Sequence, residues 1–183
     1  MATLREMTAA DVPAVAALHV ATFNETHTVA NNGPSYALRE QQWRSAFENH
    51  DGTWFGVVIE GENCELIGFA KGCPHDGGVP GYSGELNKIY LLRRYHRRGL
   101  GRRLLAEVAR RFLERGVESM LLFGDARSRT NRFYEAMGAE RILAAKSGEF
   151  HGSYGWRDLR ALLARCDAAS GARNTAGSAK VTL

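Results

Sequence analysis

The sequence has 183 residues, of which 44% are hydrophobic and 24% charged. This length suits one domain, and the composition excludes a wholly disordered chain, a collagen-like repeat and a small disulfide scaffold. We find no run of about 18 apolar residues and no basic segment followed by an apolar core at the start, so neither a membrane span nor a secretory leader is expected. The cysteines at 64, 73 and 166 are therefore expected to be reduced thiols in a cytoplasmic protein.

Positive charge is concentrated in one stretch of the chain. The formal net charge is +4, yet residues 93–115 hold nine arginines and two glutamates, a local balance of +7 that leaves −3 for the rest. Such a run is typical of a solvated helix face. It also suits an anion site, because arginine donates paired hydrogen bonds to phosphate and stays charged. Nucleic acid is a third interpretation, although no helix-turn-helix, zinc-finger or aromatic RNA-binding pattern accompanies the arginines.

The first part of the chain contains two helical and three extended patterns. Thr8 and Asp11 have the spacing of a capping box, and apolar residues recur after them at helical intervals. Ser35 is a typical helix N-cap residue. The predicted elements are a strand at Thr3–Met7, a helix at Ala9–Ala21, a loop at Asn24–Pro34, a helix from Tyr36 to Phe47, and strands at Trp54–Glu60 and Glu65–Cys73.

The second part contains a strand, helix and strand in succession. The predicted elements are a glycine-rich loop at Pro74–Gly84, a strand at Glu85–Leu92, a helix from Leu100 that ends at Gly116, a strand at Val117–Phe123, a helix at Ser128–Met137 that stops at Gly138, and strands at Glu140–Ala145 and Ser153–Asp158. Because a helix connects the strands at 85–92 and 117–123, these two should be parallel.

Together these elements predict an α/β fold with a mixed, mostly antiparallel sheet and helices on both faces. We expect a single domain at residues 1–165. Residues 166–183 are rich in alanine, serine and glycine, which predicts a weakly ordered tail.

A glycine-rich turn lies where a strand is followed by a helix. The segment Arg97–Arg102 contains Gly99 and Gly101, which let the backbone approach a phosphate without a Cβ in the way. A helix start also presents unpaired N–H groups beside the positive end of the helix dipole. The motif is neither a Walker loop nor a dinucleotide fingerprint. It predicts a pyrophosphate site built from main-chain amides, with a plain helix-starting turn as the alternative.

Two stretches resemble one known family. Glu85–Leu105 looks like the central motif of the GNAT N-acetyltransferases, and Asn131–Gly138 is similar to a later helix of that family. The strand and helix at Leu4–Leu18 are similar to its usual first elements. The resemblance spans roughly residues 4–158, with the two motifs in the family's order. It implies the family's acyl-CoA N-acyltransferase fold, in which the sheet splays between two parallel strands.

The resemblance implies how acetyl-CoA, the expected cosubstrate, would bind. The family's phosphate motif falls on residues 96–101, with His96 where the family has Arg or Gln and Arg97 where it often has Gly. The neighbouring arginines would replace the missing side chain or meet the 3′-phosphate. The free backbone edge near Leu91 would pair with the pantetheine arm and donate to the oxyanion. The cofactor-binding residues expected in this way are Tyr90, Leu91, Leu92, Arg97, Arg98, Gly99, Leu100, Gly101, Arg102, Arg103 and Asn131.

The resemblance also implies two catalytic residues. Tyr134 matches the family's tyrosine that protonates the sulfur of coenzyme A, and a phenol with a pKa of about 10 can donate at neutral pH. Glu85 matches a carboxylate often found at the start of the central strand. It would accept the amine proton, directly or through water, or bind a cationic substrate. The alternatives are an aromatic pair, Phe133 and Tyr134, that packs a helix onto the sheet, and an exposed strand-end charge at Glu85.

Other residues carry weaker signals. The pairs His50-Asp51 and His75-Asp76 lack a third ligand of suitable type and spacing, so we predict no metal site. Residues that would line or cover the acceptor pocket, with plain packing as the alternative for each, are His27, Tyr36, Trp43, Tyr82 and Tyr154.

The favoured interpretation is an acetyl-CoA-dependent N-acetyltransferase that acts by direct transfer in a ternary complex. Its acceptor is a small-molecule or peptide amine that the sequence does not identify. A homodimer is compatible with the family, and no nucleic-acid or membrane partner is expected. An acyl-CoA-binding regulatory module without turnover is the second interpretation, and a nucleic-acid-binding protein is the third. The presence of both Glu85 and Tyr134 favours the enzyme.

Overall fold

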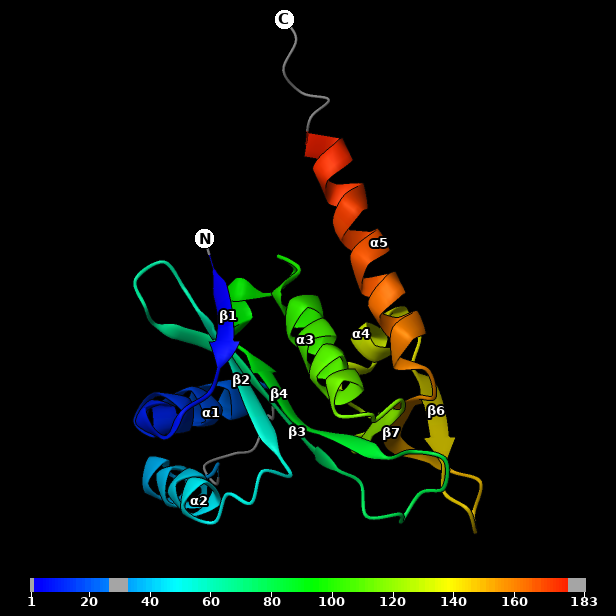
Figure 1. The fold of residues 1–183 in the computed structure, drawn as a ribbon, viewed down its shortest axis with the longest axis horizontal. Helices are drawn as coiled ribbons and strands as arrows, with labels where there is room; N and C mark the ends of the chain where they lie inside the picture. Colours follow the sequence, from blue (N-terminus) through cyan, green and yellow to red (C-terminus); the bar gives the residue numbers. More distant parts are fainter. Residues whose placement is uncertain (1, 27–32, 178–183) are drawn as a thin grey trace, which may run out of the picture.

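The structure, a computed structural model, describes residues 2–26 and 33–177 and is built on a mixed sheet. Seven strands lie in the order β1-β2-β3-β4-β5-β7-β6, and every neighbouring pair is antiparallel except β4 and β5 (Figure 1). The strands are β1 (Thr3–Glu6), β2 (Phe55–Glu60), β3 (Leu66–Pro74), β4 (Gly84–Leu91), β5 (Met120–Leu122), β6 (Glu140–Leu143) and β7 (Phe150–Trp156). The predicted fold class is confirmed.

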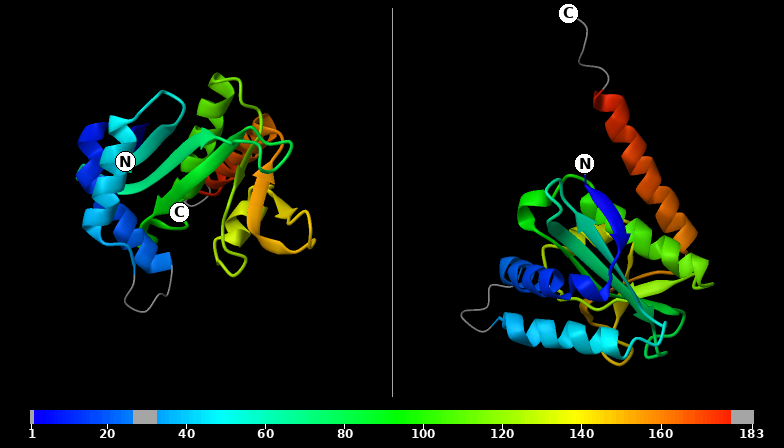
Figure 2. Two further views of the ribbon diagram at one scale, coloured as in Figure 1. Left: turned by 90° about the horizontal axis from the view of Figure 1, so that it is seen from below. Right: turned by 60° about the vertical axis from the view of Figure 1, so that its left-hand side comes forward.

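Helices cover both faces of this sheet. One face carries α1 and α2, and the other carries α3 and α5, as the views of Figures 1 and 2 agree. The helices of the described part are α1 (Val12–Thr26), α2 (Tyr36–Glu48), α3 (Leu100–Glu114), α4 (Asn131–Ala136) and α5 (Leu159–Gly177), with 3-10 turns η1 (Ala9–Asp11) and η2 (Arg93–Tyr95).

Local hydrogen bonds fix the first helices close to their predicted positions. The Thr8 N–H donates to Asp11 Oδ2 over 2.8 Å, which closes the predicted capping box. Arg5 forms an ion pair with the same carboxylate and so ties β1 to the start of the helical segment. Ser35 Oγ accepts from the Leu38 N–H and caps α2. The prediction that a loop begins at Asn24 is wrong, since α1 continues to Thr26.

The face of α3 predicted to be apolar is buried against the sheet. Its buried side chains are Leu100, Leu104, Leu105, Ala106, Val108, Ala109 and Phe112. Gly116 follows the helix with a φ of +74°, the left-handed conformation that lets the chain reverse after a helix. This packing fixes the direction of α3 and therefore the position of its first turn.

The sheet opens between β4 and β5. These strands pair over two positions only, Gly84 with Met120 and Glu85 with Leu121, and the pairing is parallel as predicted. Residues 86–91 of β4 have no partner in the described part of β5. Figure 2, left, shows the strands coloured yellow to orange turned away from β4. The edge of β4 that faces this opening is free for another extended chain.

The segment 166–183, expected to be a weakly ordered tail, begins inside helix α5. Helix α5 runs to Gly177, and its end extends away from the rest of the fold (Figure 1). Leu159, Leu162 and Cys166 are buried at helical spacing, against α3. Among the described residues, no helix has the length and apolar character that crossing a membrane requires.

Candidate active site

The junction between β4 and α3 leaves the first amides of α3 without partners inside the helix. Gly99 is the N-cap residue, with a φ of +84°, and no side chain caps the helix. The Arg103 N–H donates to Gly99 O (3.1 Å), so the N–H groups of Leu100, Gly101 and Arg102 precede the helical ladder. These amides and the positive end of the helix dipole can hold an anion.

The glycines of this loop keep it accessible to a ligand. A Cβ added to Gly101 would meet the Phe133 ring at 3.7 Å, an ordinary contact, so the helix start itself is not tightly covered by protein. Arg97 has a φ of +63°, which a glycine adopts at lower cost. This conformation explains why the resembled family often has glycine at that position.

The four arginines around the loop differ in direction. The Arg98 guanidinium lies over the Tyr95 ring, 5.3 Å from its centre. Arg103 donates to the carbonyl oxygen of Ala2 (3.0 Å), toward β1. Arg102 lines a pocket of about 260 Å³ that α5 helps to form. Arg102 and Arg103 are therefore directed toward α5 and β1, whereas Arg98 stacks on Tyr95.

The open edge of β4 presents the backbone groups of alternate residues. The Leu92 N–H donates to Ile67 O in β3 (3.0 Å). In an antiparallel ladder the backbone groups of successive residues point to opposite sides, so those of Leu91 and Ile89 turn toward the opening. His96 Nε2 lies 2.8 Å from Leu91 O at this edge. Of the predicted strand residues, Leu91 faces the opening with its backbone, whereas Leu92 and Tyr90 face β3. Ile89 was missed, although its place follows from alternation.

Tyr134 lies beside the opening, on α4. Its side chain is buried and packs near Tyr154, with 5.7 Å between ring centres, and near Phe133. Burial raises the pKa of Tyr134 to about 12, and a hydrogen bond with Thr130 counters this shift in part. The hydroxyl is therefore protonated throughout the neutral range, as a proton donor must be.

Asn131 holds the loop before α4. Its amide nitrogen donates to the carbonyl oxygens of Asp125 and Ala126, each at 3.0 Å. Its Oδ1 is buried and has no protein partner within the described residues. The side chain thus supports the turn that leads into α4, and this oxygen is the atom left for the predicted contact with the pantetheine.

Glu85 stands near the start of β4, at the last position paired with β5. It lies opposite Cys73 on β3 and accepts a hydrogen bond from Asn87 Nδ2 (2.7 Å). The carboxylate is partly exposed and in no ion pair within the described part of the chain. It is therefore available to a substrate.

The aromatic residues predicted to line an acceptor pocket occupy different environments. Trp43 is buried and donates through Nε1 to His19 Nδ1 (3.3 Å). Tyr154 is buried and donates to Glu135 Oε1 (2.9 Å). Tyr82 is buried beside Gly155, and Tyr36 is exposed. His27 lies outside the described residues.

The remaining candidates from the sequence have structural partners. His75 Nε2 accepts from the Val79 N–H, and His50 Nε2 lies 3.1 Å from Trp54 O. No group of three or more possible metal ligands occurs among residues 2–26 and 33–177.

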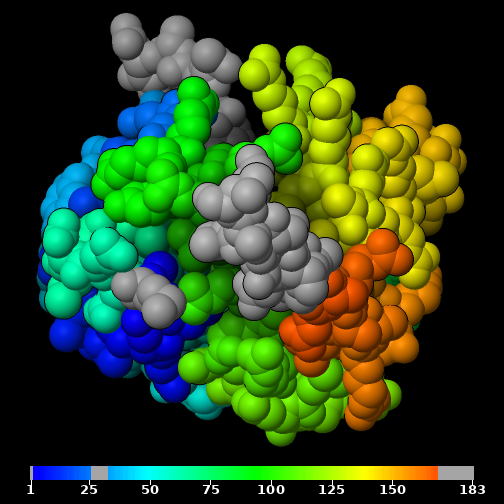
Figure 3. Space-filling model, turned by 90° about the horizontal axis from the view of Figure 1, so that it is seen from above, coloured from blue at the N-terminus to red at the C-terminus, as the bar shows by residue number. Residues whose placement is uncertain are grey.

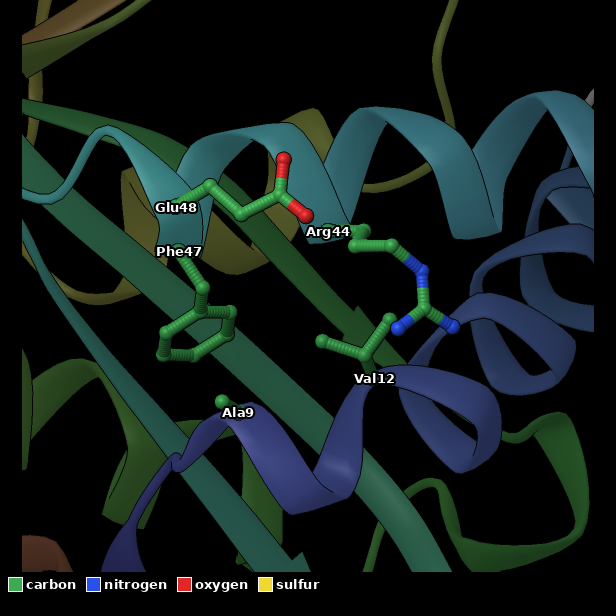
Figure 4. A pocket seen from close by; sticks show the side chains of 5 residues that line it. All are labelled: Ala9, Val12, Arg44, Phe47 and Glu48. Carbon is green, nitrogen blue, oxygen red and sulfur yellow. The ribbon is translucent and has the colours of Figure 1, made fainter.

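A second pocket, of about 230 Å³, lies between the start of α1 and α2 (Figure 4). It is lined by Ala9, Val12, Arg44, Phe47 and Glu48. Arg44 is paired with Glu40 at 2.9 Å. This pocket shares no residue with the surroundings of Tyr134 and β4, and it holds no combination of groups suited to acyl transfer.

The elements around the opening define a class of enzyme. Figure 3 shows the green surface of the β4–α3 segment and the yellow surface around α4 on either side of a recess. Uncapped helix amides for a phosphate, a free strand edge for an extended amide-rich arm, and a buried protonated phenol are the parts that an acyltransferase needs for an acyl carrier.

Comparison with known proteins identifies the family within this class. The Acetyltransferase (GNAT) family matches residues 14–139. The chain is 33% identical over 174 residues to the uncharacterized N-acetyltransferase YuaI of Bacillus subtilis (strain 168), covering 88% of this chain and 96% of YuaI. The chain belongs to the GNAT acetyltransferase family, which confirms the acyltransferase predicted from the sequence.

Solved structures show the same fold. The PaiA N-acetyltransferase of Thermoplasma acidophilum in complex with coenzyme A has a TM-score of 0.63 at 15% identity, over 85% of this chain and 98% of that one. An N-acetyltransferase of Staphylococcus aureus Mu50 has a TM-score of 0.64 at 18% identity, over 87% and 99% of the two chains. At these identities the likeness concerns the fold alone.

Proposed function

We propose that the protein transfers an acetyl group from acetyl-CoA to a primary amine while both substrates are bound. One observation carries the proposal: the uncapped amides of α3 adjoin the open end of β4, and α4, which carries Tyr134, reaches the same helix start through Phe133. Family membership supports the same reaction class.

The donor side follows from the backbone. The pyrophosphate of acetyl-CoA binds the N–H groups of Leu100, Gly101 and Arg102, with Arg97 and Arg98 beside it. The pantetheine amides pair with the backbone groups of Ile89 and with the N–H of Leu91, whose carbonyl already accepts from His96, as an added strand would. This arrangement directs the thioester toward the start of β4 and toward Tyr134.

The chemical step uses three groups of this chain. The amine nitrogen forms a bond to the thioester carbon, and the carbon–sulfur bond breaks. A main-chain N–H of the open β4 edge donates to the oxygen that becomes negative during this step. Tyr134 gives its proton to the departing sulfur and regains one from solvent. Glu85 takes the proton that the amine loses, directly or through water.

The main competitor is a module that binds acyl-CoA without turnover. It would share the donor site but would need neither Glu85 nor the Tyr134 hydroxyl. A nucleic-acid-binding protein would instead depend on the arginine-rich stretch, and its affinity would fall steeply with salt.

The test has two measurements. Calorimetry with coenzyme A at high salt should show binding, because most of the contacts are backbone hydrogen bonds. Acetyl-CoA with a panel of amines should then release free thiol and an equal amount of acetylated amine. Binding without thiol release for any amine would favour the binding module, and no binding at high salt would reject the donor site.

A further inference from the structure

Three cations from three elements meet on the α1–α2 face of the sheet, next to Glu85. Lys71 of β3 and Lys88 of β4 are direct cross-strand partners. Arg39 of α2 lies close enough for its charge to act on Lys88. The charges of Arg39 and Lys88 both act on the buried His19. Glu85 interacts electrostatically with both lysines. The cluster Arg39, Lys71 and Lys88 therefore borders the place where the proposed mechanism puts the acceptor amine.

None of the three cations forms an ion pair with a carboxylate within the described residues. Lys71 Nζ lies over the Trp54 ring, 4.4 Å from its centre. Lys88 Nζ donates to the amide oxygen of Asn87 (2.9 Å). Arg39 donates through Nη1 to the amide oxygen of Gln42 (2.8 Å), and its Nε is buried without a partner in the described part. Their hydrogen-bonding partners are neutral, so Glu85, which acts on the two lysines without forming an ion pair, is one negative charge against three positive ones.

Keeping these charges together is unfavourable for the protein alone. Like charges directly opposite on neighbouring strands destabilise a sheet. Burial lowers the pKa of Lys71 and of Lys88, and for Lys88 the charges of Lys71 and Arg39 add to this effect. A bound anion would offset both the repulsion and the loss of hydration.

We propose that the acceptor is an amine that also carries an anionic group, a carboxylate as in a free amino acid or a comparable oxyanion, and that Lys71, Lys88 and Arg39 bind this group. The proposal rests on the proposed acetyl transfer, and it names the class of acceptor for that reaction. It excludes polyamines and polycationic drugs, whose extra charges would meet the same three cations.

The cluster also prepares the amine for attack. A positive environment disfavours the ammonium form and so lowers the pKa of the bound amine. The amine then loses more readily the proton that it must lose before it becomes a nucleophile. Glu85, the nearby carboxylate, accepts that proton. The anionic group and the amine are thus bound by groups of opposite charge on adjacent strands of one sheet face.

The experiment compares acceptors that differ in one group. Amino acids, the same amino acids with the carboxylate converted to an amide, and spermidine are each assayed with acetyl-CoA by thiol release. The variants are Lys71→Met and Lys88→Met, which keep the aliphatic length, and Arg39→Gln. Arg44→Gln is the matched control, because Arg44 lies on the same helix and pairs with Glu40.

We expect higher kcat/KM for the amino acids than for their amides or for spermidine. Each cluster variant should raise KM for the anionic acceptor about ten- to hundredfold, as the loss of a charged hydrogen bond does, with KM for acetyl-CoA unchanged. The same variants should reduce the ratio of kcat/KM for the amino acid to that for its amide. Arg44→Gln should change neither this ratio nor the KM for the anionic acceptor.

Two results would overturn the proposal. One is turnover that is equal or faster with the amides or with spermidine. The other is an unchanged KM for the anionic acceptor in all three cluster variants. Either result leaves acetyl transfer itself intact, since thiol release is still observed. Failure of the proposed function would appear differently, as no thiol release with any amine.

Discussion

The imidazole Nε2 of His96 lies 2.8 Å from the carbonyl oxygen of Leu91, at the edge of β4 that faces the opening of the sheet. A carbonyl oxygen only accepts, so Nε2 carries the hydrogen of this bond. The ring thereby links the end of β4 to the residues just before Gly99. His96 stands where the resembled family has Arg or Gln, side chains that also donate.

Binding of acetyl-CoA should therefore depend on a hydrogen-bond donor at position 96 and not on the imidazole ring itself. We expect His96→Gln to keep KM for acetyl-CoA within about twofold of wild type, because an amide N–H can replace the bond. His96→Phe should raise this KM about two- to tenfold, the range for one neutral hydrogen bond. Steady-state kinetics at a saturating acceptor concentration measures both. Equal KM values for the two variants would show that the bond has no influence on donor binding.

Gly101 tests the pyrophosphate site. Gly101→Val should weaken coenzyme A binding at least about tenfold, because the branched side chain fills the space next to the free amides. Gly101→Ala should have a smaller effect in the same direction while the helix gains up to about 1 kcal/mol of stability. Calorimetry and thermal unfolding measure the two quantities. Gly78→Ala, where an added Cβ meets only atoms 3.9 Å away, is the control. A folded Gly101→Val with wild-type affinity would reject the site.

Glu85 tests the removal of the amine proton. Glu85→Gln should lower kcat at least about tenfold and move the rising limb of the pH–rate profile to higher pH, because the amine must then lose its proton unaided. The affinity for acetyl-CoA should stay nearly unchanged. Glu118→Gln, which removes an exposed carboxylate paired with Arg160, is the control. A pH profile and kcat identical to wild type would leave Glu85 as a surface charge.

Tyr134 tests the protonation of the sulfur. Tyr134→Phe keeps the ring and its packing but should lower kcat by about 10²–10⁴, with acetyl-CoA binding changed less than about threefold. The loss should shrink with an acyl donor whose thiol leaves more easily. Since the pKa of Tyr134 is raised to about 12, wild-type kcat should not fall through its ionisation as pH rises to about 10. The control is Tyr154→Phe, whose hydroxyl is bonded to Glu135. Wild-type turnover of Tyr134→Phe, measured where chemistry limits the rate, would mean that the residue only packs.

His19 provides a prediction about stability. It is 2% exposed, and burial lowers its pKa from 6.5 to about 3. As pH falls below 6.5, His19 becomes protonated in the unfolded chain but stays neutral in the folded protein. The free energy of unfolding therefore decreases as pH drops from 6.5 toward 3. The slope from this group is at most about 1.4 kcal/mol per pH unit. His19→Asn keeps an acceptor for Trp43 and should flatten this dependence in urea unfolding. Parallel curves for the two proteins would contradict the assignment.

The parts of the fold with strong local signals could be predicted from the sequence. Ser35 caps α2, and Gly116 and Gly138 adopt the positive φ values of +74° and +81° expected after helices. The parallel pairing of β4 and β5 followed from the helix that connects them. The amide-lined start of α3 followed from the glycines at a strand-to-helix junction.

Other features depend on contacts that no local pattern contains. The packing of α5 on α3 was not predicted: its buried residues Leu159, Leu162 and Cys166 lie at the end of the predicted domain and at the first position of the segment expected to be a weakly ordered tail. The predicted strand at 117–123 shortens to Met120–Leu122, because only these residues find partners in β4 and β7. The meeting of Lys71 and Lys88 depends on the register of β3 and β4, which includes a bulge after Lys71.

Strand β4 has one proposed role for its backbone and another for its side chains. In the proposed complex its main-chain edge faces the donor, and that edge is the same for every residue type except proline. In the same proposal its side chains at 85 and 88 face the acceptor, together with Lys71 of β3. Substitutions at these side chains can therefore change which amine is chosen without disturbing how the thioester is held. A lineage of such proteins can diversify its acceptors by point mutation while the acetyl-donating half of the site stays constant.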